Sequence, residues 1–178
     1  MSPPTDANPT ELLHWLRTTD EEPVAFVRDV LSTVLWAVGV GLLLFAVSGV
    51  WPPMVAVESG SMEPQMYRGD LIFVMEEGRL AGGAAHADTD VVTYPAGKQS
   101  GYEEFNDHGD VIIFEPDGNG RETPIIHRAM FWVEAGENWY NRTDSDYVGV
   151  SNNCRELANC PAPHAGFIMK GDNNAGYD

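Results

Sequence analysis

The sequence predicts a mainly β domain outside the membrane, attached to one N-terminal transmembrane helix. The first observation is a stretch of 28 residues, 30–57, that carries no ionisable side chain. The second is a set of short apolar runs further along, introduced by Gly69 and Gly109, which are typical of strands. The third is the length of the chain, since about 120 of its 178 residues remain after the anchor, enough for one modest core.

Residues 1–29 form the predicted cytoplasmic segment. Within it, residues 10–17 (TELLHWLR) have the spacing of a short amphipathic helix, with Thr10 as its N-cap. Such a helix is suited to lie on the inner surface of a membrane.

Residues 30–52 are the predicted transmembrane anchor, because 30–50 alone (VLSTVLWAVGVGLLLFAVSGV) is long enough to cross ~30 Å of hydrocarbon. A cleaved signal peptide fits less well, since the apolar run is long and an acidic segment precedes it. A buried core helix fits less well too, since globular helices rarely run this far without polar residues. Arg17 and Arg28 precede the anchor and Arg68 is the first basic residue after it, which favours a single-pass cell-membrane protein with a cytoplasmic N-terminus.

Residues 53–178 form the predicted external domain. Its strands are expected at residues 70–75, 110–114 and 129–134, where apolar and β-branched residues gather. Residues 79–107 read as a surface excursion around a hairpin arm at 91–94.

A second, polar excursion covers residues 136–163 and contains both cysteines of the chain. Cys154 and Cys160 lie in a segment predicted to face the oxidising side of the membrane, so a small disulfide loop is expected there. Asn141 begins an Asn-Arg-Thr sequence, which is a potential glycosylation site.

The net charge of −17 excludes nucleic acid as a natural partner, because the phosphate backbone would be repelled. Lysine is rare as well, at positions 98 and 170 alone. Acidic, lysine-poor surfaces stay hydrated in concentrated salt, where charge repulsion is screened over a few ångströms. The composition therefore indicates a halophilic archaeon as the source.

A serine turn, Ser59-Gly60-Ser61, follows directly after the apolar stretch, where a hydroxyl nucleophile would act on substrates that are themselves in the membrane. Such a nucleophile needs a base of near-neutral pKa and a group that orients the base. Among the five histidines, His127 follows the apolar pair Ile125-Ile126 and precedes a predicted strand, a position suited to a rigid base.

Several motifs occur together and in order: ESGSMEP after the anchor, then RGDLIFV, GDVIIF, PIIHR and KGDNNAGYD. In this combination the chain resembles the type I signal peptidases, specifically their archaeal and endoplasmic-reticulum branch, in which histidine stands where the bacterial enzymes have lysine. The resemblance covers residues 53–78, 109–128 and 167–178. It implies a signal-peptidase-like β fold for the catalytic domain.

The resemblance also implies roles for individual residues. Ser61 would be the nucleophile, His127 the general base and Asp178 the group that orients it, with Asp172 in support and Ser59 helping to stabilise the oxyanion. No cofactor or metal is implied. The substrates would be the signal peptides of secretory preproteins, bound as extended strands between the strand that starts at Leu71 and the one before His127. Membrane lipid and the protein translocation machinery are the other expected partners.

Two alternatives stay open from the sequence alone. A serine-lysine membrane hydrolase would use Lys98 or Lys170 as its base, and a non-catalytic anchored subunit of a secretion complex would not need Ser61 at all. The chain also departs from the family pattern, because members normally continue beyond the position of Asp178. We therefore expect either a C-terminally incomplete sequence or an additional way of holding Asp178 in place.

Overall fold

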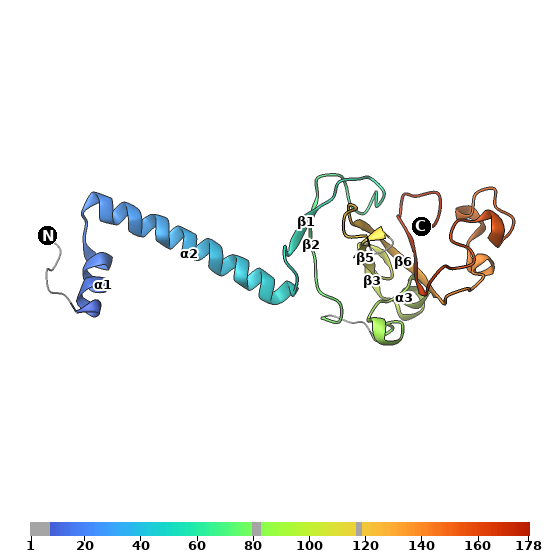
Figure 1. The fold of residues 1–178 in the computed structure, drawn as a ribbon, viewed down its shortest axis with the longest axis horizontal. Helices are drawn as coiled ribbons and strands as arrows, with labels where there is room; N and C mark the ends of the chain where they lie inside the picture. The colour runs from blue at the N-terminus through green and yellow to red at the C-terminus, as the bar shows by residue number, and fades with distance from the viewer. Residues whose placement is uncertain (1–7, 80–82, 117–118) are drawn as a thin grey trace. The chain divides into compact units, whose positions relative to one another are not determined.

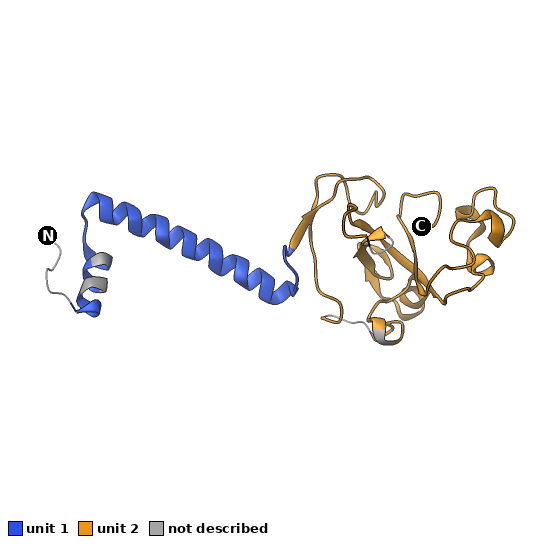
Figure 2. Ribbon diagram, viewed as in Figure 1, with its two compact units in different colours: residues 1–53 blue, residues 54–178 orange. Residues whose placement is uncertain are grey.

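The computed structural model describes residues 8–79, 83–116 and 119–178. By its internal contacts the chain divides into two compact units, residues 1–53 and residues 54–178 (Figure 2). The boundary lies within one residue of the predicted end of the anchor.

The first unit contains two helices, α1 (Pro9–Thr18) and α2 (Glu22–Ser48). The predicted amphipathic helix is therefore confirmed, but its predicted cap is wrong. Asn8 holds the N-cap position without a side-chain cap, and Pro9 occupies the first turn, where its missing N–H costs nothing. Thr10 consequently lies inside the helix.

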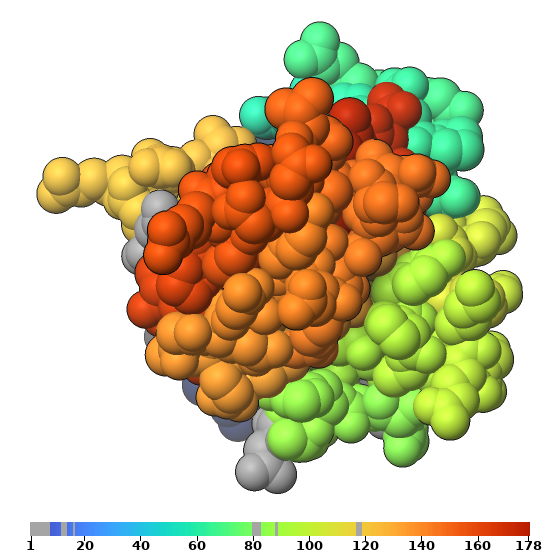
Figure 3. Space-filling view, turned by 90° about the vertical axis from the view of Figure 1, so that its right-hand side faces the viewer, coloured from blue at the N-terminus to red at the C-terminus, as the bar shows by residue number. Residues whose placement is uncertain are grey.

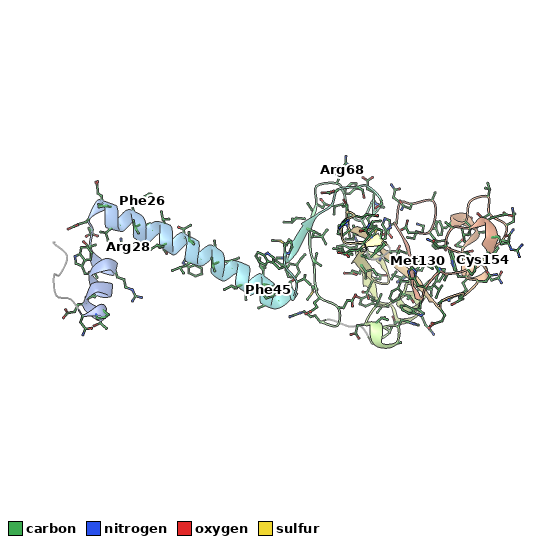
Figure 4. All side chains as sticks on the ribbon, in the orientation of Figure 1. Phe26, Arg28, Phe45, Arg68, Met130 and Cys154 are labelled. Atoms are coloured by element: carbon green, nitrogen blue, oxygen red, sulfur yellow. A yellow bond between two sulfur atoms is a disulfide. The ribbon has the colours of Figure 1, made fainter. Side chains whose placement is uncertain are left out.

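α2 is the one helix in the described ranges that is long and apolar enough to cross a membrane, with a mean hydropathy of 2.4 in its most apolar window. It begins eight residues before the start of the predicted anchor. It also ends earlier than the predicted anchor does, at Ser48, because Gly49 (φ 83°) closes the helix in the left-handed conformation. Its apolar side chains are exposed, among them Phe26 at 70% and Trp36 at 75%. Phe26 and Phe45 are marked in Figure 4. Such exposure over a whole helix fits lipid as its surroundings.

The second unit is built from small antiparallel sheets (Figure 1). Its largest sheet has three strands in the order β5-β6-β7, with β6 at the centre. The strands are β1 (Met54–Ala56) paired with β2 (Leu71–Phe73), β3 (Glu103–Glu104) paired with β4 (Asp107–His108), and β5 (Val111–Phe114), β6 (Ile125–Val133) and β7 (Gly166–Lys170).

The three predicted strands are present, as β2, β5 and β6, which agrees with a mainly β external domain. β6 begins earlier than expected, at Ile125, and so contains His127. β1 was not predicted, because its three residues continue the apolar stretch of the anchor without a visible break.

The predicted hairpin arm at 91–94 is wrong. Val91 and Val92 are buried outside any strand, and Tyr94 begins a short helix, α3 (Tyr94–Ser100). Pro95 in the first helical turn favours this start. The Val92 backbone exchanges two hydrogen bonds with Asp110, one from Val92 N to the carboxylate (2.6 Å) and one from Asp110 N to Val92 O (2.8 Å). Residues 91–93 are therefore buried, and this part of the expected excursion does not stay on the surface.

Residues 136–163 contain short 3-10 turns, at Tyr140–Arg142, Ser145–Tyr147 and Cys154–Glu156, and the predicted disulfide between Cys154 and Cys160 is confirmed. A further 3-10 turn lies at Ala87–Thr89. The 136–163 segment is not only a surface excursion, because Trp139 is 1% exposed and packs on Phe131 of β6.

Candidate active site

The serine turn lies in the connection between β1 and β2, and the residue that follows it, Met62, fixes its position. Met62 is buried with Val57 and Met66 in a small core cluster. By contrast Ser61 is half-buried and Ser59 exposed, and their hydroxyl oxygens are 3.1 Å apart and hydrogen-bonded. The turn therefore presents two hydroxyl groups at the surface while a buried neighbour holds the backbone in place.

His127 is the third residue of β6, lies opposite Ile112 of β5 and is 5% exposed. Its Nδ1 is hydrogen-bonded to the Asp178 carboxylate. A neutral imidazole that donates from Nδ1 has an unprotonated Nε2. The bond to Asp178 thus leaves Nε2 as the nitrogen that can accept a proton.

The loop Gly171–Asn174 lies close to both the serine turn and β6. Asn173 donates from its backbone N to Ser61 O (2.8 Å) and from its side-chain Nδ2 to Gly60 O (3.1 Å). A Cβ atom on Gly171 would lie 2.7 Å from Ser61 O and 2.8 Å from His127 Nε2. Nothing larger than glycine fits at this point, so Gly171 allows the serine turn to come close to Nε2.

The neighbour of His127 on β6, Arg128, belongs to a separate cluster. Arg128 is 1% exposed and forms two parallel hydrogen bonds with the Asp172 carboxylate, of 2.9 Å from Nε and 2.7 Å from Nη2. Its Nη1 contacts four backbone carbonyls, including those of Glu104 (3.0 Å) and Gly109 (2.9 Å). Because all of these partners are protein groups, the buried guanidinium links β6 to the β3–β4 hairpin and to the 171–174 loop.

These contacts refine the predicted site. Ser59 and Ser61 share the serine turn, His127 faces Asp178, and the 171–174 loop brings these elements together. Asp172 pairs with Arg128 and not with His127. The sequence alone did not predict the role of Arg128, although this residue stands next to His127. The available signal was an arginine beside the expected base, together with a second aspartate in the last motif.

Lys170 lies opposite Arg128 in the β6–β7 register. Since consecutive side chains leave a strand on opposite faces, Lys170 shares the Arg128 face, away from His127. Its Nζ donates to Gly171 O (2.9 Å) and lies 4.2 Å from the centre of the Tyr147 ring, and burial lowers the pKa of the amine. Lys98 is exposed on α3. Neither lysine contacts the serine turn within the described ranges.

The other histidines have different surroundings. His86 stacks on Trp132 with 5.3 Å between ring centres, and His108 lies beside Glu103. His14 and His164 are exposed. In the described part of the chain, no group of three or more His, Cys, Asp or Glu side chains is placed to hold a metal ion.

Two of the cavities that adjoin the sheet bear on the predicted site. One, of about 270 Å³, lies between Ile72 and Phe73 of β2 and Ile126 of β6, so the two elements expected to form the walls of a substrate site do line one cavity. The other, of about 280 Å³, is lined by residues of β5 and β7 and reaches Asp178. In Figure 3 the dark red C-terminal residues lie close to both the teal residues around position 60 and the orange 136–163 segment.

Comparison with known proteins supports the resemblance. The chain is 28% identical over 152 residues to the signal peptidase complex catalytic subunit sec11 of Aspergillus oryzae, covering 84% of this chain and 57% of that protein. It is 27% identical over 126 residues to SEC11 of Saccharomyces cerevisiae, covering 71% of this chain and 44% of that protein. The chain thus spans about half the length of these curated relatives. No protein-family model and no solved structure matches it.

The similarity to these catalytic subunits confirms the resemblance to signal peptidases of the endoplasmic-reticulum type. Placement in the archaeal branch, and a halophilic source, stay predictions.

Proposed function

We propose that this chain is a membrane-anchored serine endopeptidase that removes signal peptides from secretory preproteins. The proposal is supported by the arrangement around Gly171, where an added Cβ atom would lie 2.7 Å from Ser61 O and 2.8 Å from His127 Nε2, while the Asp178 carboxylate is hydrogen-bonded to the other ring nitrogen. Similarity to two catalytic subunits of signal peptidase complexes supports the reaction class.

In the proposed reaction, Ser61 Oγ attacks the scissile carbonyl carbon while His127 Nε2 accepts the hydroxyl proton. The imidazolium that forms is stabilised by the Asp178 carboxylate at Nδ1. Collapse of the tetrahedral intermediate breaks the peptide C–N bond, and the proton passes from Nε2 to the leaving amine of the mature protein. Water then attacks the acyl-enzyme with His127 as base again, which releases the signal peptide with a new carboxylate and restores Ser61.

The negative charge that develops on the carbonyl oxygen needs hydrogen-bond donors. The Ser61 backbone N–H and the Ser59 hydroxyl are the proposed donors, each contributing roughly 3 kcal/mol to the transition state. Ser59 is suited to this role because its oxygen lies 3.1 Å from Ser61 Oγ and the residue is exposed.

α2 is the proposed membrane anchor, with the N-terminus in the cytoplasm and residues 54–178 on the external face. Arg17 and Arg28 before the apolar segment favour this orientation. A signal peptide is itself a short membrane segment, so an anchored enzyme meets it at the lipid surface. Lipid and the translocation machinery are therefore proposed partners.

The direct test is cleavage of a preprotein in membranes that contain the full-length chain. Ser61→Ala and His127→Ala should each lower the cleavage rate at least about 10³-fold. Ser59→Ala should cost roughly 10²-fold to 10³-fold, as expected for an oxyanion donor. Ser100→Ala, at an exposed serine on α3, is the matched control and should cleave at the wild-type rate. Normal cleavage by Ser61→Ala would refute the proposal and favour the non-catalytic anchored subunit.

The serine-lysine alternative is separated by the base. Lys170 has the lowered pKa expected of a catalytic lysine, but that shift arises from burial on the Arg128 face of the sheet. Full activity of His127→Ala, combined with loss of activity in Lys170→Met or Lys98→Met, would establish the alternative.

A further inference from the structure

The residue before Asp178, Tyr177, is half-buried and contacts three aromatic rings. The centre of the Tyr177 ring lies 5.8 Å from that of Phe131, 6.1 Å from that of Trp139 and 5.8 Å from that of Tyr147, each with edge-to-face geometry. We call Phe131, Trp139 and Tyr147 the aromatic socket. Two of its three members come from the 136–163 segment, and edge-to-face contacts of this kind are favourable beyond the area they bury.

Polar contacts fix both the socket and the ring within it. The backbone N of Asp144 donates to the Tyr177 hydroxyl (3.0 Å). Trp139 is 1% exposed, and its Nε1 donates to Asn159 O (2.8 Å), beside Cys160 of the disulfide. The disulfide loop therefore holds Trp139, and Trp139 with its two neighbours holds Tyr177.

Asp178 needs such support. Its side chain is 34% exposed, and its backbone lies beyond the last strand, with one backbone hydrogen bond, from Asp178 N to Met169 O (2.9 Å). A carboxylate in this setting keeps many rotamers unless the residues around it are fixed. The contact with a 5%-exposed imidazole demands one geometry. The seated ring of the preceding residue supplies the missing restraint.

We propose that Tyr177 is a positioning residue for the cleavage reaction, and that the 136–163 segment provides the socket through which it holds Asp178 against His127 Nδ1. The proposal rests on the proposed function, because it acts through the Asp178–His127 pair. It gives the cysteine-bearing segment a task in catalysis.

The test uses the full-length chain in lipid or detergent with a preprotein substrate, and compares Tyr177→Ala with Tyr177→Phe. Tyr177→Ala should lower kcat roughly 10-fold to 100-fold with little change in KM, because the pair is misplaced while substrate contacts remain. Tyr177→Phe keeps the ring in the socket and should stay within about threefold of the wild-type kcat.

A double-mutant cycle separates positioning from loss of stability. In the Asp178→Asn background, Tyr177→Ala should have no further effect on kcat, since the carboxylate that it positions is already absent. Trp132→Ala is the matched control: this ring lies on the same strand and packs on His86 and Phe167 but not on Tyr177, so its kcat should be unchanged. All assays are run well below the melting temperature of each variant, as measured by circular dichroism.

The possible failures are distinguishable. Wild-type kcat in Tyr177→Ala, or an effect of Tyr177→Ala that adds in full to that of Asp178→Asn, would overturn the positioning role while leaving the proposed function intact. Normal cleavage by Asp178→Asn would likewise overturn the positioning role, because the carboxylate that Tyr177 is proposed to hold would not be needed. Normal cleavage by Ser61→Ala would overturn the proposed function itself.

Discussion

Each face of β6 carries one side chain that pairs with an aspartate: His127 with Asp178 on one face, and Arg128 with Asp172 on the other. The two pairs differ in burial and in hydrogen bonding. His127 and Arg128 are adjacent, point to opposite faces, and each meets an aspartate from the last eight residues of the chain. The Arg128–Asp172 pair is enclosed, with side chains 1% and 11% exposed, and both groups are satisfied by several hydrogen bonds. Asp178, by contrast, is 34% exposed and meets one nitrogen of His127.

The C-terminal residues 171–178 thus contribute to structure through Asp172 and to the proposed chemistry through Asp178. A buried, fully bonded pair is costly to break, so Arg128–Asp172 is suited to hold the 171–174 loop in place. A partly exposed pair with one free ring nitrogen is suited to proton transfer. Variants on the two faces should therefore fail in different ways.

The largest expected effect on stability is on the Arg128 face. Asp172→Asn leaves a buried guanidinium without its charge partner and should lower the free energy of unfolding by about 3–5 kcal/mol. The measurement is urea denaturation of the full-length chain in detergent. A loss below about 1 kcal/mol, the range of a surface ion pair, would show that the pair is not structural.

The next largest effect is expected at Gly171, which lies next to Asp172 in the chain and close to His127. Gly171→Ala places a Cβ between Ser61 O and His127 Nε2, and should lower kcat about 100-fold and stability by about 1–3 kcal/mol. Gly166→Ala in β7 is the matched control, since its Cβ would meet its first neighbour at 3.9 Å. Equal kcat values for the two variants would contradict the close approach at Gly171.

A smaller effect is expected from the disulfide. Replacing Cys154 and Cys160 together by serine opens a short loop and should lower the free energy of unfolding by about 2 kcal/mol, because the unfolded chain gains entropy. Thermal melting with and without reductant measures this loss. A double variant that melts at the wild-type temperature would show that the loop is held by its other contacts.

The smallest effect on cleavage is expected at Lys170. Lys170→Met should cleave at the wild-type rate, because the amine lies on the Arg128 face. Burial lowers the pKa of Lys170 in the folded state below its ordinary value of 10.5, so between these two values the unfolded chain binds more protons. Wild-type stability relative to Lys170→Met should therefore rise as the pH increases through that range. A fall over the same range would mean that the amine is better stabilised when charged in the folded chain.

Much of this organisation was predictable from local sequence. The apolar stretch indicates α2, apolar runs after glycine indicate β2 and β5, and close spacing indicates the Cys154–Cys160 bridge. The motifs also name Ser61, His127 and Asp178, which the structure gathers around the 171–174 loop, while their catalytic roles stay predictions.

The rest depends on contacts between distant parts of the chain. The partner of Arg128 follows from which face of β6 each side chain takes, and that register is set by β5 and β7. The helix at Tyr94 replaces an expected strand because Pro95 opens a turn and Gly97 packs against the Gly109 backbone, a contact that no local pattern reveals. The socket around Tyr177 likewise joins residues from β6 and the 136–163 segment.

The most direct test of the division between the two faces is the cleavage rate and melting temperature of Asp178→Asn, measured side by side. We predict a cleavage rate lowered about 10³-fold to 10⁴-fold, as for the orienting aspartate of other serine proteases, with a melting temperature close to that of the wild type. A cleavage rate equal to that of the wild type would contradict the account, because His127 would then work without the carboxylate that faces its Nδ1.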